Sequence, residues 1–240
     1  MVVTLRRLST PAVLAAVGLA LWLWVSSQEL DSIERRLLDG AVILAHVNEH
    51  LALATLSTAV VVVVAVSLGI VLTRPALRRV TPIAVGVANI GQATPSIGLL
   101  VLIALVGGIG FEYAVIALVA YSTLPVLRNT LVGLQQVDRS LIEAARGMGM
   151  TRFATLRRIE LPLAVPVILA GVRTALVVNV GTATLATFTN GGGLGDTINS
   201  GIRLGRETVL ITGAVLTAVM ALALDWLAEA TEDILRPRGL

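Results

Sequence analysis

The sequence predicts an all-α integral membrane protein with about six transmembrane helices. Hydrophobic residues make up 56% of the 240 positions and charged residues 14%, whereas a soluble domain of this size carries about a quarter charged residues. Apolar stretches of about 20 residues, the length that a spanning helix needs, are separated by polar breaks. These stretches are expected to be helical, because a bilayer offers the backbone no water to bond with.

The sequence contains no combination of residues that would carry catalysis. It has 0 cysteines, which excludes disulfides, a thiolate nucleophile and cysteine metal sites. We find neither a nucleophile paired with a base nor a metal-ligand set. We therefore expect no catalytic, cofactor-binding or metal-binding residue here, and a function other than that of an enzyme.

Residues 1–50 are predicted to hold one span and an external amphipathic segment. No small-x-small cleavage site cleanly follows the apolar run 11–25, which favours an uncleaved span over a signal peptide. From 28 to 50, charged and apolar residues alternate in a way typical of a surface helix.

Two histidines close this N-terminal region. His46 and His50 lie four residues apart, a spacing that allows both to bind one metal ion from a helix. No third ligand lies near them in the sequence. We therefore predict two interfacial histidines before the second span rather than a zinc site.

Residues 51–230 are predicted to form a membrane core with five spans, and residues 231–240 a cytoplasmic tail. The core spans are expected at about 51–72, 81–109, 113–129, 162–188 and 209–226. A triple glycine at 191–193 lies in an external loop. It lacks the lysine and the preceding strand of a phosphate-binding loop, so we reject that function for it.

The third apolar region is interrupted by polar residues between Asn89 and Ser96. Pro95 disfavours helical geometry at Thr94 and removes a backbone donor. Unwound backbone at membrane depth persists only inside a protein bundle or beside a water-filled cavity. The segment is therefore either a buried kink or part of a solute path. By polarity and depth, the candidate path residues are Gln92, Thr94, Ser96, Tyr121, Asn179 and Thr182.

Arg173 is a charge inside the fifth predicted span. At about 1.5 Å per residue it lies roughly 16 Å along the helix from Pro162. A charge at that depth needs a carboxylate, carbonyl oxygens or water. We predict a structural ion pair or carbonyl clamp, with substrate contact as the alternative.

The segment from Asp138 to Pro162 is the one long stretch with charges throughout. Apolar residues recur at helical spacing in its first part, Gly147 and Gly149 interrupt the helix, and Thr151 can cap a second one. Pro162 suits the first turn of the next helix. Two short amphipathic helices of this kind can dock in a groove on a soluble partner. The alternative is a basic interfacial loop that only orients the protein.

This segment resembles the EAA loop of ATP-binding-cassette (ABC) importer permeases. The resemblance is carried by Glu143, Ala144 and Ala145, then Gly149, then Ile159, Leu161 and Pro162. It implies a bundle like that of type I ABC importer permeases, with residues 131–162 as the loop that couples to an ATPase and Gly149 as its bend. It also implies that ATP and Mg²⁺ are bound by the partner ATPase and not by this chain.

Further stretches resemble permeases of osmoprotectant importers, which take up glycine betaine, carnitine or choline. They are Asn89-x-x-Gln92-x-x-Pro95-Ser96, Leu124-Pro125-x-x-Arg128-Asn129-Thr130, Gly133-Leu-x-x-Val137-Asp138, Ile142 to Met150, Ala170 to Ala175, Gly181-x-Ala183-Thr-Leu-Ala186 and Gly191 to Gly195. Ala93 departs from this pattern, in which we expect a hydroxyl residue. The implied function is a permease subunit for ATP-driven, binding-protein-dependent import of a quaternary amine. The alternatives are import of another solute, such as ergothioneine or an amino acid, and an ATP-independent channel or secondary transporter.

The resemblance also implies the partners. They are two ATPase subunits, a second permease chain that is identical or homologous, a separate extracytoplasmic binding protein and the lipid bilayer, with no nucleic acid. All of these would meet the chain at the bacterial cytoplasmic membrane.

The distribution of arginines predicts the orientation. With both termini in the cytoplasm, most arginines lie inside and few outside, as the positive-inside rule requires. The inside set is Arg6, Arg7, Arg74, Arg78, Arg79, Arg128, Arg139, Arg146, Arg152, Arg157, Arg158, Arg236 and Arg238, and the outside set is Arg35, Arg36, Arg203 and Arg206. The segment 131–162 then lies in the cytoplasm.

Overall fold

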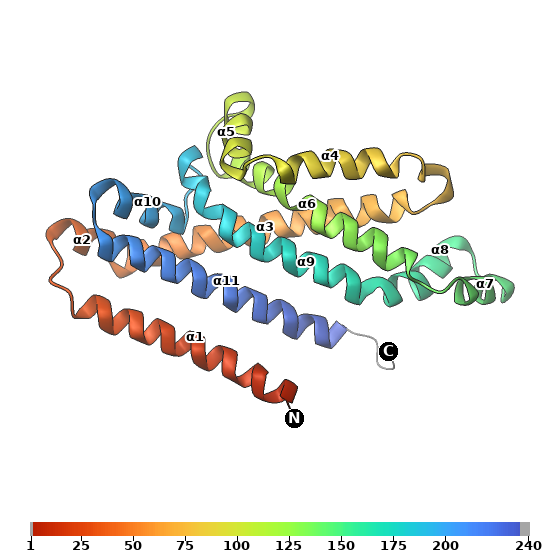
Figure 1. Ribbon diagram of the computed structural model, residues 1–240, viewed down its shortest axis with the longest axis horizontal. Helices are drawn as coiled ribbons and strands as arrows, with labels where there is room; N and C mark the ends of the chain where they lie inside the picture. The colour runs from red at the N-terminus through yellow and green to blue at the C-terminus, as the bar shows by residue number, and fades with distance from the viewer. Residues whose placement is uncertain (1, 236–240) are drawn as a thin grey trace. The chain divides into compact units, whose positions relative to one another are not determined.

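The computed structural model describes the backbone of residues 2–235 and the side chains of residues 9–232. Every regular element in this range is helical (Figure 1). The α-helices are α1 (Val2–Ser26), α2 (Ser32–Leu37), α3 (Gly40–Leu72), α4 (Thr81–Ala93), α5 (Ser96–Gly107), α6 (Phe111–Gln135), α7 (Arg139–Gly147), α8 (Arg152–Thr155), α9 (Leu161–Ala183), α10 (Leu194–Leu204) and α11 (Glu207–Leu235).

The number of candidate membrane spans agrees with the sequence prediction. Among the described residues, 5 helices are long and apolar enough to cross a membrane, or up to 6 if α4 and α5 together form one span. The all-α membrane fold is therefore confirmed.

Helix α3 begins earlier than expected, at Gly40. The predicted external segment thus consists of the short helix α2 and the first turns of α3. His50 is fully buried, and its Nε2 donates to the carbonyl oxygen of Val180 over 2.9 Å. Both histidines therefore lie within α3 and not before it, while their interfacial position stays a prediction.

The interruption of the third apolar region is confirmed. Helix α4 ends at Ala93 and α5 begins at Ser96, while Thr94 and Pro95 have extended backbone angles, with ψ of 133° and 127°. The Thr94 amide and hydroxyl both donate to the Ile90 carbonyl, at 3.0 and 2.8 Å. The last turn of α4 thus ends with two hydrogen bonds to one carbonyl oxygen.

The chain divides into two compact units, and several long helices contribute to both. Unit 1 comprises Met1–Ser57, Pro95–Val119 and Leu176–Leu227. Its core is built largely from leucine and alanine, and these residues are Leu53, Leu100, Ala114, Val115, Ala117, Leu118, Ala183 and Ala186. Backbones approach closely here, because a Cβ on Gly195 would lie 2.1 Å from the Thr184 carbonyl oxygen and one on Gly201 would lie 2.4 Å from the Leu210 nitrogen.

Unit 2 comprises Thr58–Thr94, Ala120–Ala175 and Ala228–Leu240. Leu134, Ala164 and Ile168 form a buried apolar cluster in it. Small residues again allow close helix contacts, as is usual in membranes. A Cβ on Gly91 would lie 2.6 Å from the carbonyl oxygen of Ala120.

Arg173 forms the structural ion pair that the sequence analysis predicted. Its NH2 group lies 3.1 Å from Oε2 of Glu229, and both residues belong to unit 2. The acidic partner comes from α11, 56 residues further along the chain.

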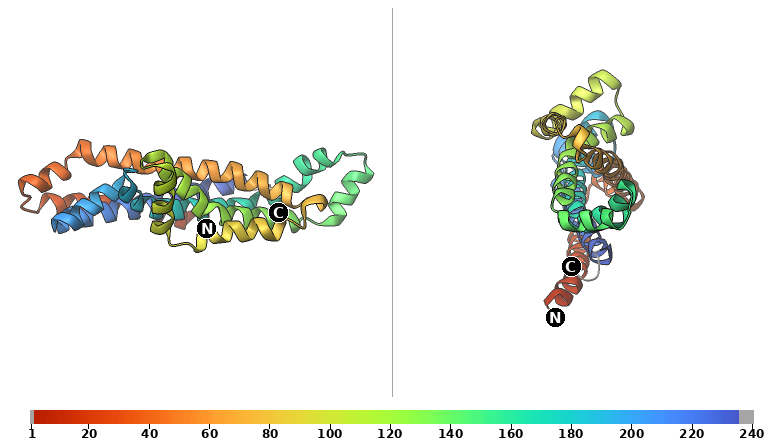
Figure 2. Two further views of the ribbon diagram at one scale, coloured as in Figure 1. Left: turned by 90° about the horizontal axis from the view of Figure 1, so that it is seen from above. Right: turned by 90° about the vertical axis from the view of Figure 1, so that its right-hand side faces the viewer.

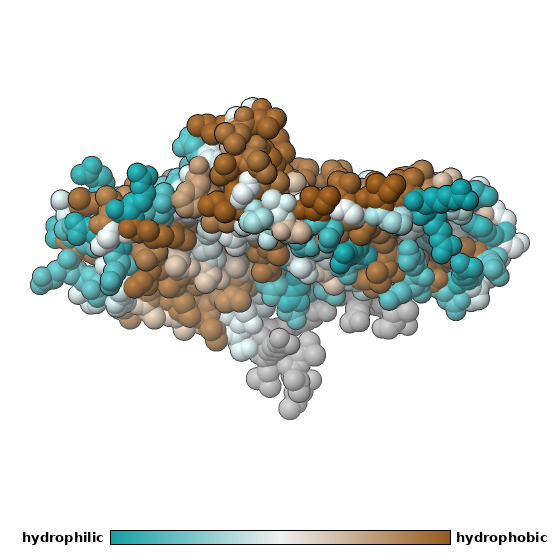
Figure 3. All heavy atoms as spheres, turned by 45° about the horizontal axis from the view of Figure 1, so that its top comes forward, coloured by the Kyte–Doolittle hydropathy of each residue, from teal (hydrophilic) through white to brown (hydrophobic). Residues whose placement is uncertain are grey.

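The surface of α5 is strongly apolar. Val106 is 92% exposed and Leu105 is 77% exposed. Figure 3 shows the hydrophobic atoms gathered over this helix, which protrudes at the top of the view. Such a surface is expected for a helix in contact with lipid or with another membrane subunit.

The close backbone contact at Gly195 provides a test of the packing in unit 1. We expect Gly195→Ala to lower the stability by about 1–3 kcal/mol, because the added methyl group overlaps a carbonyl oxygen that cannot swing away. The matched control is Gly181→Ala in the same unit, where no atom lies within 4 Å of the added Cβ. Thermal unfolding in detergent measures both, and equal midpoints for the two variants would contradict this packing.

Candidate coupling loop

Helix α7 starts at an N-cap that the sequence encodes directly. Asp138 precedes the helix, and its Oδ1 accepts the backbone N–H of Ser140 over 2.8 Å. The pKa of Asp138 lies below its usual 3.8, mainly because the Ser140 backbone N–H donates to the carboxylate and also because the Ser140 hydroxyl does. A lowered pKa means that the carboxylate stabilises α7 at pH values above about 3.8 and loses this effect as the pH falls through the folded-state pKa. The cap is therefore intact at physiological pH.

The bend after α7 is a Schellman motif centred on Gly149. The Gly149 amide donates to the Arg146 carbonyl over 3.0 Å, and the Met150 amide donates to the Ala145 carbonyl over 3.1 Å. This pattern requires a left-handed residue after the helix. Gly149 has a φ of 85°, while no atom lies within 4 Å of the position of its missing Cβ. Glycine is thus required for its backbone angle and not for space, and the predicted bend is confirmed.

The second helix of the loop is short and merges with the next span. Thr151 caps α8, since its hydroxyl oxygen accepts the Ala154 amide over 3.2 Å, as the sequence predicted. After the four residues of α8, residues Leu156–Glu160 form a π-helix that runs directly into α9. Pro162 is the second residue of α9 and lies in its first turn, as predicted.

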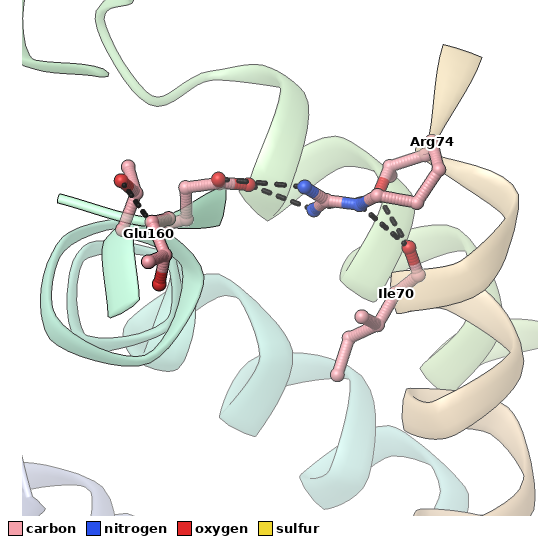
Figure 4. A network of polar contacts seen from close by, with 6 residues as sticks. Ile70, Arg74 and Glu160 are labelled. Atoms are coloured by element: carbon pink, nitrogen blue, oxygen red, sulfur yellow. Dashed lines mark hydrogen bonds and ion pairs between the residues drawn. The ribbon is translucent and has the colours of Figure 1, made fainter. Parts of the chain in front are cut away.

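An ion pair anchors the π-helix to the end of α3 (Figure 4). Two guanidinium nitrogens of Arg74 lie 2.7 and 3.4 Å from the two carboxylate oxygens of Glu160. Arg74 Nε donates to the Ile70 carbonyl over 3.2 Å, which fixes the guanidinium. Glu160 is only 5% exposed. Bidentate arginine–carboxylate pairs of this kind are strong and directional.

The sequence analysis missed this ion pair. Arg74 was counted only among the arginines expected inside, and Glu160 is the variable position between Ile159 and Leu161. The available signal was a single acidic residue at the end of a stretch rich in arginine. Its partner is 86 residues away, so sequence spacing alone could not identify it.

A cleft of about 980 Å³ lies beside the loop within unit 2. Helix α7 contributes Arg139, Glu143 and Arg146 to its lining, and the end of α3 and the turn that follows contribute Arg74 and Arg78. The glutamate of the EAA sequence thus lines a cleft whose charged residues are mostly arginines.

The loop also exposes large apolar side chains. Met148 is 76% exposed, Phe153 is 70% exposed and Leu141 is 47% exposed. Figure 2 shows α7 and α8 lying beyond the adjoining ends of α6 and α9, as the green segments. Exposed apolar residues among charges are typical of a surface that binds a protein partner.

The remaining residues of the EAA pattern differ in exposure. Glu143, Ala144 and Gly149 are exposed, and Ala145 is buried against the protein. Ile159, Leu161 and Pro162 are half-buried. The pattern therefore places three residues on the surface of the loop and four at least partly inside the protein.

The candidate solute-path residues divide between the two units. Gln92, Thr94 and Tyr121 belong to unit 2, and Ser96, Asn179 and Thr182 belong to unit 1. Asn179 is fully buried, and the other five are half-buried. No single unit brings all six together, so the path lining stays a prediction.

Comparison with known proteins identifies the family. Residues 65–238 match the family described as "Binding-protein-dependent transport system inner membrane component". The chain belongs to this family. The permease is 39% identical to the glycine betaine/carnitine/choline transport system permease protein OpuCB of Bacillus subtilis, over 84% of this chain and 92% of that protein. It is also 39% identical to the osmoprotectant import permease protein OsmY of Salmonella typhimurium, over 93% of each chain.

Solved structures confirm the fold. The MetNI methionine ABC transporter in an inward-facing conformation has a chain that superposes with a TM-score of 0.73 at 24% identity, covering 87% of the permease and 100% of that chain. A chain of an amino acid ABC transporter superposes with a TM-score of 0.68 at 20% identity, covering 86% of the permease and 100% of that chain. The fold is that of the type I ABC importer permeases.

The family decides the broad function. The permease is the inner-membrane transport subunit of a binding-protein-dependent ABC importer, and the alternative of an ATP-independent channel or secondary transporter is set aside. Its partners include an ATPase and a substrate-binding protein. As a transport subunit, it is not itself the enzyme of the system.

The Arg74–Glu160 ion pair can be tested by its effect on stability. We expect Glu160→Gln to destabilise the permease by about 1–3 kcal/mol, since it leaves the Arg74 guanidinium without its counter-charge. Glu160→Gln combined with Arg74→Gln should recover part of that loss. Thermal unfolding in detergent measures the cycle, with the exposed Arg78→Gln as the control. Strictly additive losses in the double variant would contradict a direct interaction.

Proposed function

We propose that the permease imports a quaternary-amine osmoprotectant such as glycine betaine, carnitine or choline. The supporting observation is that relatives 35–40% identical over most of the chain, including OpuCB and the choline transport system permease protein OpuBB of Bacillus subtilis, are named for these solutes. OsmY is named for import of an osmoprotectant. The second candidate is an importer of another small solute, such as an amino acid or ergothioneine. The fold alone does not separate the two candidates, because the methionine transporter has a chain of the same fold.

The loop 131–162 would bind the ATPase. Its exposed Met148 and Phe153 supply apolar contact area, and the arginines around them supply charge. We assign Glu143, Ala144 and Gly149 to the contact surface, and Ala145, Ile159, Leu161 and Pro162 to its attachment. Two ATPase subunits would each grip one loop of two permease chains, identical or homologous, and would bind the ATP and Mg²⁺.

The loop's construction suits the transmission of force. The Schellman motif fixes the angle between α7 and α8, and the Arg74–Glu160 pair fixes the π-helix to the end of α3. Closure of the ATPase dimer on ATP would therefore move α9 and α3 together, and hydrolysis would reset the inward-open state. Gln92, Thr94, Ser96, Tyr121, Asn179 and Thr182 would line a low-affinity path, with high-affinity recognition left to the binding protein.

The proposal places both termini and the coupling loop in the cytoplasm. The arginines of the described loops support this orientation, since Arg74, Arg78 and Arg79 and the five arginines of the coupling loop would all face inward. Of the others that support it, Arg6 and Arg7 have side chains outside the described residues, and Arg236 and Arg238 lie wholly outside them.

The substrate assignment is tested by reconstitution. The permease, its ATPase and its binding protein are placed in vesicles, and uptake of labelled glycine betaine, carnitine and choline is compared with uptake of ergothioneine and methionine. We expect ATP-dependent uptake of at least one of the first three and none of methionine. Uptake restricted to methionine would overturn the substrate class, and uptake restricted to ergothioneine would overturn the assignment to an osmoprotectant. Full uptake without ATP would overturn the coupling mechanism.

The coupling assignment is tested at Gly149. A valine there is forced into a left-handed conformation that costs about 1–2 kcal/mol, enough to reduce the bent population by roughly five- to thirtyfold. We therefore expect Gly149→Val to cut uptake severely while ligand binding to the binding protein is unchanged. Gly147→Ala is the matched control, because Gly147 lies in α7 and no atom lies within 4 Å of its added Cβ. Uptake by Gly149→Val at the control's rate would contradict the role of the bend.

A further inference from the structure

Three side chains that can bind a metal converge in unit 1. His46 and Glu49 lie on α3, and Asp196 lies in the first turn of α10. One ligand atom from each of the three lies within 4.8 Å of the other two. The pair from α3 is three residues apart, which places both side chains on one face of the helix. The third ligand, Asp196, comes from a different helix that lies far from α3 in the sequence.

Gly192 and Gly193, which precede α10, lie against this face of α3. The Gly193 amide donates to Oε2 of Glu49 over 2.9 Å. A Cβ on Gly192 would lie 2.7 Å from the same oxygen. Gly192 and Gly193 also have φ values of 79° and 95°, which other residues rarely adopt. The glycines therefore let the backbone come close enough to bring Asp196 to the histidine and glutamate.

Each of the three side chains is held by a hydrogen bond to a group outside the trio. His46 Nδ1 lies 2.8 Å from the hydroxyl oxygen of Thr197. The Thr187 hydroxyl donates to Oδ1 of Asp196 over 2.5 Å, and Glu49 accepts the Gly193 amide. Bonds of this kind orient the ligands of metal sites, here the imidazole ring and the two carboxylates.

We propose that His46, Glu49 and Asp196 form a binding site for a divalent transition-metal ion of the Zn²⁺ class. One imidazole nitrogen and two carboxylates suit Zn²⁺, which commonly takes three protein ligands and leaves one position for water. The partial exposure of the three residues leaves room for that water. Ca²⁺ and Mg²⁺ prefer more oxygen ligands and no imidazole, so they should compete poorly. A bound ion would link the first turn of α10 to α3.

The test is metal titration of the full-length permease, purified in detergent through an affinity tag without histidine. Co²⁺ serves as the spectroscopic probe, and Zn²⁺ is added to displace it. We expect one Co²⁺ per chain, displaced by Zn²⁺ and not by excess Mg²⁺. We also expect Zn²⁺ to raise the thermal unfolding temperature. Absence of saturable binding, or equal displacement by Mg²⁺, would overturn the proposal.

Variants separate this site from unspecific binding. His46→Gln, Glu49→Gln and Asp196→Asn should each weaken Co²⁺ binding by more than about tenfold, and Thr187→Val by about tenfold through loss of its bond to Asp196. Glu112→Gln is the matched control, an exposed glutamate of the same unit that should leave binding unchanged. The ligands come from two helices, His46 and Glu49 from α3 and Asp196 from α10, so misfolding of one variant, seen by circular dichroism, leaves the others decisive. Parent-like affinity in all well-folded ligand variants, or loss in the control, would overturn the proposal.

Discussion

The ion pair between Arg74 and Glu160 is the interaction on which the geometry of the coupling loop depends. It joins the end of one long apolar helix to the π-helix that starts another. Glu160 is almost fully buried, and an unpaired carboxylate there would be costly. The pairing therefore favours one arrangement of the two segments, and the exposed helices α7 and α8 are carried by that arrangement.

The loop is attached differently at its two ends. On the side of α9, the π-helix continues into the span without a break, so a displacement of α8 is carried directly into the first turns of α9. On the side of α6, three residues from Gln136 to Asp138 separate the helices. The buried side chain of Val137 holds this connection to the protein, while the Asp138 cap starts α7 afresh. The loop is thus attached rigidly at its α9 end, where Glu160 forms the ion pair with Arg74.

Helix caps, breaks and bends could be predicted from the sequence, because each depends on one or two neighbouring residues. The cap at Thr151, the break at Thr94 and the bend at Gly149 follow from the chemistry of single residues and were all found. The span count followed from hydropathy. The N-terminal boundary of α3 was missed, because the residues before Leu51 are too polar to be read as part of a membrane span. In the structure they belong to α3, and His50 among them bonds to the Val180 carbonyl of α9.

What the sequence could not reveal are partners that come from distant segments. Arg173 was expected to have a partner, but the choice of Glu229 depends on how α9 and α11 pack. The same limit applies to the proposed metal site, because the sequence analysis paired His46 with His50, whereas the structure brings His46 and Glu49 together with Asp196. Asp196 reaches His46 from 150 residues away, because two glycines with positive φ allow the backbone to lie against Glu49. Long-range pairing of this kind is decided by backbone proximity, which depends on small residues in the structure more than on the charged residues themselves.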